Sequence, residues 1–196
     1  MGKLSLDFYL RSDVVQISRE LLGKELFTKI DGEITSGIIT ETEAYAGFDD
    51  RASHAFGNRR TSRTEVMYAK GGTAYVYLCY GIHHLFNVVC NVAGVPHAVL
   101  IRAIAPSSGL PIMLKRRKKK SMDKTLSTGP GTMSQALGIR TSHSGLDLCS
   151  NLIWIQDSKI EVEEKNVTIG PRIGVDYAGE DALLPYRFRW NSKISR

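Results

Sequence analysis

Residues 62–106 read "SRTEVMYAKGGTAYVYLCYGIHHLFNVVCNVAGVPHAVLIRAIAP". This stretch is rich in β-branched and aromatic side chains, which pack well on a pleated sheet. Gly-Gly, Tyr-Gly and Ala-Gly-Val-Pro interrupt it where tight turns between strands are expected. The stretch therefore predicts a run of antiparallel strands, with Tyr80 and Gly81 at one of the turns.

Shorter elements are predicted on both sides of this stretch. Residues 12–27 have apolar side chains at helical spacing, and Ser12 or Asp13 can cap the helix that they predict. Residues 24–45 predict two strands around an Asp-Gly dipeptide, which suits the positive φ angles of a hairpin turn. Residues 127–139 predict a Gly/Pro turn followed by a short helix.

The order of these elements indicates the fold class. Strands do not alternate with long helices, which argues against a doubly wound parallel sheet. The chain has 196 residues, of which 42% are hydrophobic, so it suffices for one domain with its own core. We expect an α+β fold: a single domain, residues 1–196, around a curved antiparallel β-sheet with peripheral helices and a protruding β-hairpin.

Charge and cysteine content exclude some classes of protein. Lys and Arg number 26 against 20 Asp and Glu, a formal charge of +6 that weakly favours a polyanionic partner. Cys79, Cys90 and Cys149 form neither a disulfide framework nor a CxxC metal motif. The start of the chain lacks the features of a secretion signal, and no segment approaches the roughly 18 apolar residues of a membrane span. We therefore expect a cytoplasmic protein without membrane contact.

A polar stretch, "ETEAYAGFDDRASHAF" at residues 41–56, follows the second predicted strand. Alternation along a strand places Glu41, Glu43 and Tyr45 on one face. Three interpretations of that face are open: a strand face exposed to solvent, a metal site, or a catalytic base with an aromatic neighbour. The possible metal ligands also include Asp49, Asp50 and His54, but their spacing matches none of the stronger metal signatures.

Tyrosines are concentrated in "TAYVYLCYG", where Tyr75 and Tyr77 share one strand face and Tyr80 stands at a turn. Aromatic side chains are common in strands, and we interpret Tyr75 in that way. The basic segment "GNRRTSR" lies just before this strand. Tyrosines beside arginines are typical of surfaces where aromatic rings stack on bases and guanidinium groups hold phosphates.

Six blocks together resemble the alkyladenine (3-methyladenine) DNA glycosylase family: "ETEAYAGFDDRASHAFG", "NRRTSRTEVMY", "GTAYVYLCYGIHHLFNVV", "VLIRAIAP", "STGPGTMSQALGI" and "RIGVDYAG". They extend over nearly the whole chain. The resemblance implies a monofunctional enzyme that hydrolyses the N-glycosidic bond of a damaged purine in double-stranded DNA and leaves an abasic site. It further implies a monomer that uses no metal, no cofactor and no Schiff-base lysine.

The resemblance also implies residue roles. Glu43 corresponds to the general base, and Glu41 to a structural or electrostatic neighbour. The remaining implied positions are the base-stacking residues Tyr45, His54 and Tyr77, the DNA-intercalating Tyr80, the guanine-excluding Asn87, the polar Arg102 beside the active-site water, and the phosphate contacts Arg59 and Arg63. Tyr45 and Tyr77 could attract a positively charged alkylated purine through their ring faces, by about 0.5–2 kcal/mol each.

Some features depart from the family pattern or leave alternatives open. His83 and His84 follow Tyr80, where an aromatic and an apolar residue are expected, and they could lie on the surface or line the pocket. The run "KRRKKK" at residues 115–120 could form a mobile loop that contacts DNA or stays in solvent. A DNA-binding module without activity and a metal-dependent hydrolase built on the Glu/Asp/His cluster are the alternative functions.

Overall fold

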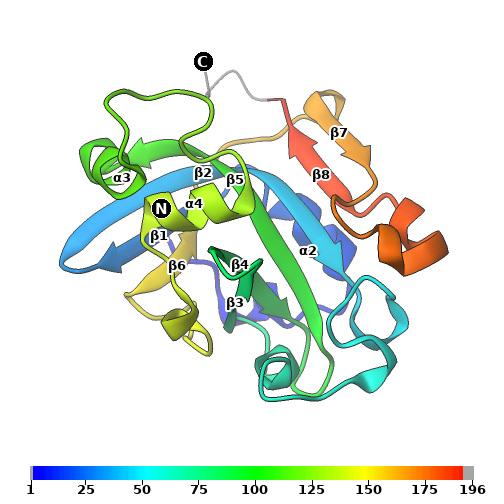
Figure 1. Ribbon diagram of the computed structural model, residues 1–196. Helices are drawn as coiled ribbons and strands as arrows, with labels where there is room; N and C mark the ends of the chain where they lie inside the picture. Colours follow the sequence, from blue (N-terminus) through cyan, green and yellow to red (C-terminus); the bar gives the residue numbers. More distant parts are fainter. Residues whose placement is uncertain (1, 192–196) are drawn as a thin grey trace.

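The computed structural model describes residues 2–191 and contains one 8-stranded antiparallel sheet (Figure 1). The order of strands is β3-β4-β5-β2-β1-β6; β8 pairs with β2, and β7 pairs with β8. The strands are β1 (Glu25–Ile30), β2 (Glu33–Tyr45), β3 (Ala74–Cys79), β4 (His83–Cys90), β5 (His97–Ser108), β6 (Ile153–Gln156), β7 (Val167–Gly170) and β8 (Arg187–Trp190). The predicted α+β class and antiparallel sheet are confirmed.

The helices are short and peripheral to this sheet. The α-helices are α1 (Leu6–Tyr9), α2 (Val14–Glu20), α3 (Leu110–Arg117) and α4 (Pro130–Leu137). The 3-10 helices are Gly47–Asp49, Phe56–Asn58, Glu65–Tyr68, Thr141–His143, Glu164–Asn166 and Asp176–Leu183. Ile17 of α2 and Met133 of α4 join one core with strand residues such as Phe86 and Ile101. Among the helices described, none has the length and apolar character needed to cross a bilayer.

Local sequence explains how several elements begin and end. The side chain of Asp13 accepts a hydrogen bond from the Gln16 amide at 2.8 Å and so caps α2, as one of the two predicted caps. Asp31 and Gly32 have φ angles of 56° and 77°, which confirms the predicted turn between β1 and β2. Gly138, with a φ of 78°, ends α4 as expected.

Strand β2 is the long central strand and is bent (Figure 1). Along one edge it pairs first with β1 and then, from Glu41 to Glu43, with β8. Along its other edge it pairs with β5, and this register shifts on both sides of Glu41. Such bulges bend a strand and re-aim its side chains. They place Arg102 of β5 opposite the stretch that holds Glu41 and Glu43.

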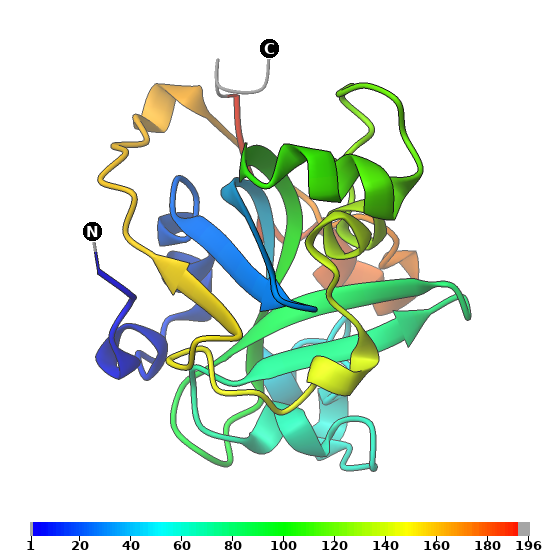
Figure 2. The same cartoon turned by 90° about the vertical axis from the view of Figure 1, so that its left-hand side faces the viewer.

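Strands β3 and β4 form the protruding hairpin, which extends from the body of the molecule in Figure 2. Tyr80 and Gly81 at its tip have φ angles of 51° and 72°. Positive φ at two successive turn residues is typical of tight hairpins, although it is uncommon for a bulky residue. Tyr80 is 90% exposed, so its ring extends into solvent beyond the hairpin.

The basic run at residues 115–120 differs from the loop considered in the sequence analysis. Its first half is the last turn of α3, because the helix ends at Arg117. Arg116 donates to the Ile30 carbonyl at 3.2 Å, and Arg117 donates to the Leu126 carbonyl at 3.1 Å. These two arginines therefore hold α3 against its neighbours, which a charge count along the sequence could not show.

Candidate active site

A cavity of about 390 Å³ opens over the part of the sheet formed by β2, β5, β4 and β3. Its walls include Tyr45, His54, Tyr77, Asn87 and Arg102. The first turn of α4 and the segment 173–175 complete the lining. The volume lies in the roughly 300–1,000 Å³ range of small-molecule pockets. The structure thus brings all the predicted base-pocket residues together around one hollow.

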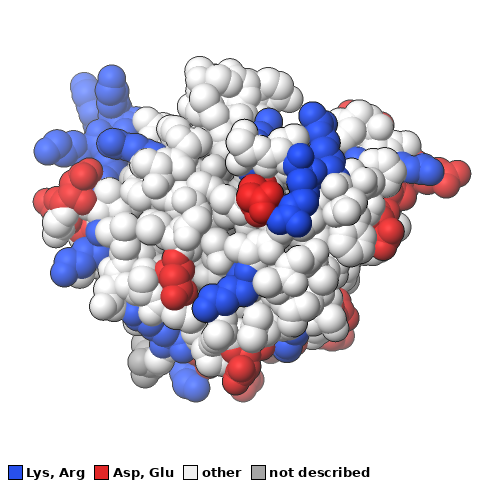
Figure 3. Space-filling model, turned by 90° about the horizontal axis from the view of Figure 1, so that it is seen from below, with Lys and Arg blue, Asp and Glu red and all other residues white. Residues whose placement is uncertain are grey.

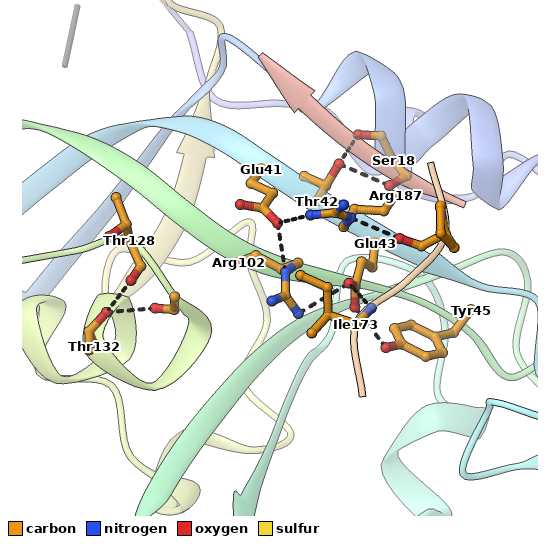
Figure 4. Close-up of polar contacts among 12 residues, drawn as sticks. Ser18, Glu41, Thr42, Glu43, Tyr45, Arg102, Thr128, Thr132, Ile173 and Arg187 are labelled. Carbon is orange, nitrogen blue, oxygen red and sulfur yellow. Dashed lines mark hydrogen bonds and ion pairs between the residues drawn. The ribbon is translucent and has the colours of Figure 1, made fainter. Parts of the chain in front are cut away.

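Glu43 is not itself part of the cavity lining and has no exposed surface, but its carboxylate contacts residues that line the cavity. Its Oε1 accepts from the Ile173 amide at 2.8 Å and from Arg102 Nη1 at 3.1 Å, and its Oε2 accepts from the Tyr45 hydroxyl at 2.9 Å (Figure 4). Burial raises the pKa of Glu43, although these three donors act in the opposite direction. A carboxylate has about four acceptor positions, and these contacts occupy three of them.

Glu41 belongs to the same polar network and contacts two arginines. Arg102 Nε donates to its Oε1 at 2.9 Å, and Arg187 Nη1 of β8 donates to the same oxygen at 3.3 Å (Figure 4). Arg102 therefore lies between the two carboxylates and pairs with both. The negative charge of Glu41 contributes to the raised pKa of Glu43, but as the smallest of its causes. This contact set fits a structural and electrostatic neighbour.

Two neighbours of His54 define the tautomer of its imidazole ring. Its Nδ1 lies 2.9 Å from the Tyr75 hydroxyl, and its Nε2 lies 3.4 Å from Arg63 Nη2. Because a guanidinium group can only donate, Nε2 is the acceptor and Nδ1–H donates to Tyr75. Burial, followed by the charges of Arg63 and Arg59, lowers the pKa of His54 to about 4, so the ring is neutral at pH 7.

Tyr75 was interpreted as an ordinary strand aromatic, and that interpretation is incomplete. Its side chain is 2% exposed, lines the cavity and orients His54 through the hydroxyl. It also packs beside Tyr77, with ring centroids 5.4 Å apart. The shared strand parity of Tyr75 and Tyr77 was the signal that could have placed both at the site.

Asn87 lies on β4 and is 4% exposed. Its Nδ2 donates to the Tyr75 carbonyl at 3.1 Å and to the Leu85 carbonyl at 3.3 Å. These two acceptors fix both the position of the carboxamide and the identity of its nitrogen. The side chain is therefore a rigid part of the cavity wall.

The comparison with known families agrees with this geometry. A family model described as methylpurine-DNA glycosylase matches residues 7–193 of the chain. The chain belongs to the methylpurine-DNA glycosylase family. It is consequently a DNA glycosylase, an enzyme of base excision repair that acts on damaged DNA, and the resemblance noted in the sequence is confirmed.

Curated relatives of this family member cover nearly the whole chain. A protein of Chlamydia felis is 50% identical over 190 residues, which are 96% of each chain. A protein of Bacillus cereus strain G9842 is 44% identical over 189 residues, 92% of each chain, and one of Desulfitobacterium hafniense is 42% identical over 195 residues, 96% of this chain and 95% of the relative. All three carry the provisional name 3-methyladenine DNA glycosylase.

Residues outside the cavity of this methylpurine-DNA glycosylase form a basic surface beside it. Arg51, Arg59 and Arg63 line a second cavity of about 520 Å³ that shares His54 and Tyr177 with the first. Figure 3 shows one face of the molecule, on which Lys and Arg side chains form separate clusters on a largely uncharged surface. The basic residues expected near phosphates therefore lie next to the cavity.

The two histidines after Tyr80 anchor the hairpin. A side chain at Gly131 of α4 would meet the ring of His83 at 2.7 Å, so the ring packs on that glycine. His84 Nδ1 accepts a hydrogen bond from the Thr141 amide at 3.1 Å. His83 also lines the cavity, whereas His84 joins the hairpin to the segment after α4.

An ion pair that the sequence analysis missed supports one side of the cavity. Arg172 donates to the two carboxylate oxygens of Asp50 at 2.5 and 2.8 Å, and both side chains are almost fully buried. Asp50 also accepts hydrogen bonds from the Ala46 and Ala52 amides, at 3.0 Å each. The pair ties the loop that carries His54 to the segment whose Ile173 amide contacts Glu43.

Three acidic side chains within residues 41–56 form ion pairs with arginines. Glu41 and Glu43 pair with Arg102, and Asp50 pairs with Arg172. In the part of the chain that the structure describes, no group of three or more His, Cys, Asp and Glu side chains is placed to hold a metal ion. This arrangement does not favour the metal-dependent hydrolase considered as an alternative.

Proposed function

We propose that this protein excises alkylated purines, 3-methyladenine among them, from double-stranded DNA as a monofunctional glycosylase. The observation that carries the proposal is the buried carboxylate of Glu43 beneath a cavity walled by Tyr45, His54 and Tyr77. The names of the relatives support the same lesion class. We further propose that it acts as a monomer in the cytoplasm, without a cofactor.

The geometry supports recognition of a nucleotide that has left the duplex. A stacked base hides its glycosidic bond, and extruding it costs a few kcal/mol, least for a damaged base. In this proposal Tyr80 fills the vacated stack, because its ring extends from the tip of the hairpin. Tyr45 and Tyr77 with the neutral His54 then hold the extruded base. Arg59 and Arg63 contact phosphates from the adjoining cavity.

The chemical step is assigned to Glu43. As the base leaves, the sugar gains oxocarbenium character, in analogy with glycosidases. The ionised carboxylate stabilises this charge and accepts a proton from the attacking water. Arg102 holds the carboxylate in place and borders the same space. Among the described residues that line the cavity there is no lysine, which supports a water nucleophile over a Schiff base.

Product analysis tests the proposed function directly. We expect the protein to release free 3-methyladenine from methylated duplex DNA, as identified by chromatography. The backbone should stay intact until alkaline treatment, and a chelator should have no effect. Strand cleavage without alkali, or activity that a chelator abolishes, would contradict the proposal; binding without any base release would favour the inactive DNA-binding module.

Tyr80→Ala should weaken binding to a lesion-containing duplex by about 1–3 kcal/mol, because it removes the ring that fills the vacated stack. Binding to undamaged duplex should change much less. Fluorescence anisotropy with both duplexes measures the difference, and Tyr80→Phe is the control because it keeps the ring. Equal loss of affinity in Tyr80→Ala and Tyr80→Phe would exclude a stacking role.

Asn87→Ala should increase excision of guanine relative to alkyladenine by roughly tenfold, as expected when a steric element of a specificity pocket is removed. In this proposal the carboxamide of Asn87 clashes with the exocyclic amine that distinguishes guanine from adenine. Single-turnover rates on the two substrates give the ratio. Asn91→Ala is the matched control, since Asn91 follows the same strand outside the cavity lining. An unchanged ratio in Asn87→Ala would show that Asn87 does not discriminate against guanine.

A further inference from the structure

Two of the tyrosines that line the base cavity, Tyr45 and Tyr77, each have an arginine against the ring. The guanidinium carbon of Arg172 lies 4.8 Å from the ring centroid of Tyr45, and that of Arg63 lies 4.8 Å from the ring centroid of Tyr77. Both tyrosines line the cavity, whereas neither arginine is among its lining residues. A base between these walls would therefore have a cation behind each ring.

The two arginines differ in how their charge is balanced. Arg172 is buried and paired with both oxygens of Asp50, so its positive charge is compensated. Arg63 is exposed, lines the second cavity and is absent from the ion pairs among residues 2–191. It also approaches His54 Nε2 at 3.4 Å. The Tyr77 side of the base cavity thus has an uncompensated positive charge behind it.

This charge opposes the attraction expected between the tyrosines and a cationic purine. The face of an aromatic ring attracts a cation through its quadrupole. A guanidinium against the ring of Tyr77 repels a second cation near the same ring, while stacking of an uncharged base is unaffected. The same guanidinium contributes to the lowered pKa of His54 and so keeps that wall neutral.

We propose that Arg63 is a specificity-determining residue that shifts the base cavity towards uncharged damaged purines and away from positively charged ones. The inference rests on the proposed function, because it concerns the base held in that cavity. It modifies the role expected for Arg63 from the sequence: the side chain acts on the base through Tyr77 and His54, in addition to any phosphate contact.

A matched pair of lesions isolates the charge. Three duplexes differ at one nucleotide: 3-methyladenine on a 2′-fluorinated sugar, which is cationic and resists loss of the base; 3-deaza-3-methyladenine, which has nearly the same shape without the charge; and adenine. Dissociation constants are measured for the Glu43→Gln protein with and without Arg63→Gln. Any phosphate contact that Arg63 makes contributes equally to the affinity for both lesions. It therefore cancels in the ratio of the affinities for the cationic and the uncharged lesion.

We expect Arg63→Gln to raise this ratio by about three- to tenfold in favour of the cationic lesion, and Arg63→Lys to keep most of the original ratio. Arg60→Gln is the matched control, because Arg60 stacks on Tyr68 at 4.4 Å and pairs with Glu65 away from the base cavity. If Arg63→Gln weakens binding of both lesions equally, Arg63 acts only on the backbone and the inference is wrong. If neither lesion binds more tightly than adenine, the proposed function fails, and the inference fails with it.

Discussion

Glu43→Gln should reduce excision of 3-methyladenine by about 10²- to 10⁴-fold, the usual contribution of a general base. Glutamine has nearly the same size, so the fold and the binding of a damaged duplex should persist. Single-turnover kinetics with fluorescence binding on the same protein separate the two effects. A Glu43→Gln protein that excises at the original rate would exclude Glu43 as the base.

The matched control for this substitution is Glu41→Gln. Glu41 lies on the same strand and also pairs with Arg102. The Ile173 amide and the Tyr45 hydroxyl, however, donate to Glu43 and not to Glu41. Most of the activity should therefore survive. Because the base acts when ionised and burial raises the pKa of Glu43, excision should fall as pH decreases through a midpoint above the usual range of a glutamate.

Arg172→Met should destabilise the folded protein by about 3–5 kcal/mol, because it leaves the buried charge of Asp50 without its partner. Chemical denaturation monitored by tryptophan fluorescence measures the free energy of unfolding. The double substitution Asp50→Asn with Arg172→Met should cost less than Arg172→Met alone, since no unpaired charge is then buried. A larger loss in the double variant would show that the ion pair itself is not the source of the effect.

Arg60→Met is the control that shows how much of the change in the free energy of unfolding is due to burial. Arg60 and Glu65 form an ion pair at 2.5 Å, but both side chains are more than half exposed. Exposed pairs of this kind contribute little to the free energy of unfolding, because water screens the two charges. A difference of several kcal/mol between Arg172→Met and Arg60→Met would therefore reflect burial, because both substitutions remove one arginine from a carboxylate.

The local pattern of the sequence was sufficient for the strands and for the strand face shared by Glu41, Glu43 and Tyr45, whereas the family resemblance was needed to assign His54, Asn87 and Arg102 to the base cavity. Strand parity placed Glu41 and Glu43 on one side of β2, and both now contact Arg102. The turn at Tyr80 followed from the glycine beside it. These features depend on neighbouring residues, so their signals lie within a few positions of one another. The roles that the resemblance implied for individual residues stay predictions.

Local sequence patterns could not predict contacts between residues that are far apart in the chain. Arg172 and Asp50 are 122 positions apart, and nothing in their local sequence indicates that they pair. The double register shift that brings Arg102 between two carboxylates depends on how β2 and β5 meet. The basic run at residues 115–120 looked uniform in sequence, yet Arg116 and Arg117 are used to hold α3.

The segment from Ile173 to β8 has a consequence for when this enzyme becomes active. The Ile173 amide contacts Glu43, and β8 supplies the edge partner of β2 at Glu41–Glu43. Tyr45 and Arg102 precede this segment in the chain, so the ribosome must translate past Ile173 before the third donor to the carboxylate exists. A chain that ended before Ile173 would lack both this amide and the edge strand β8, and so could not complete the polar network around Glu43.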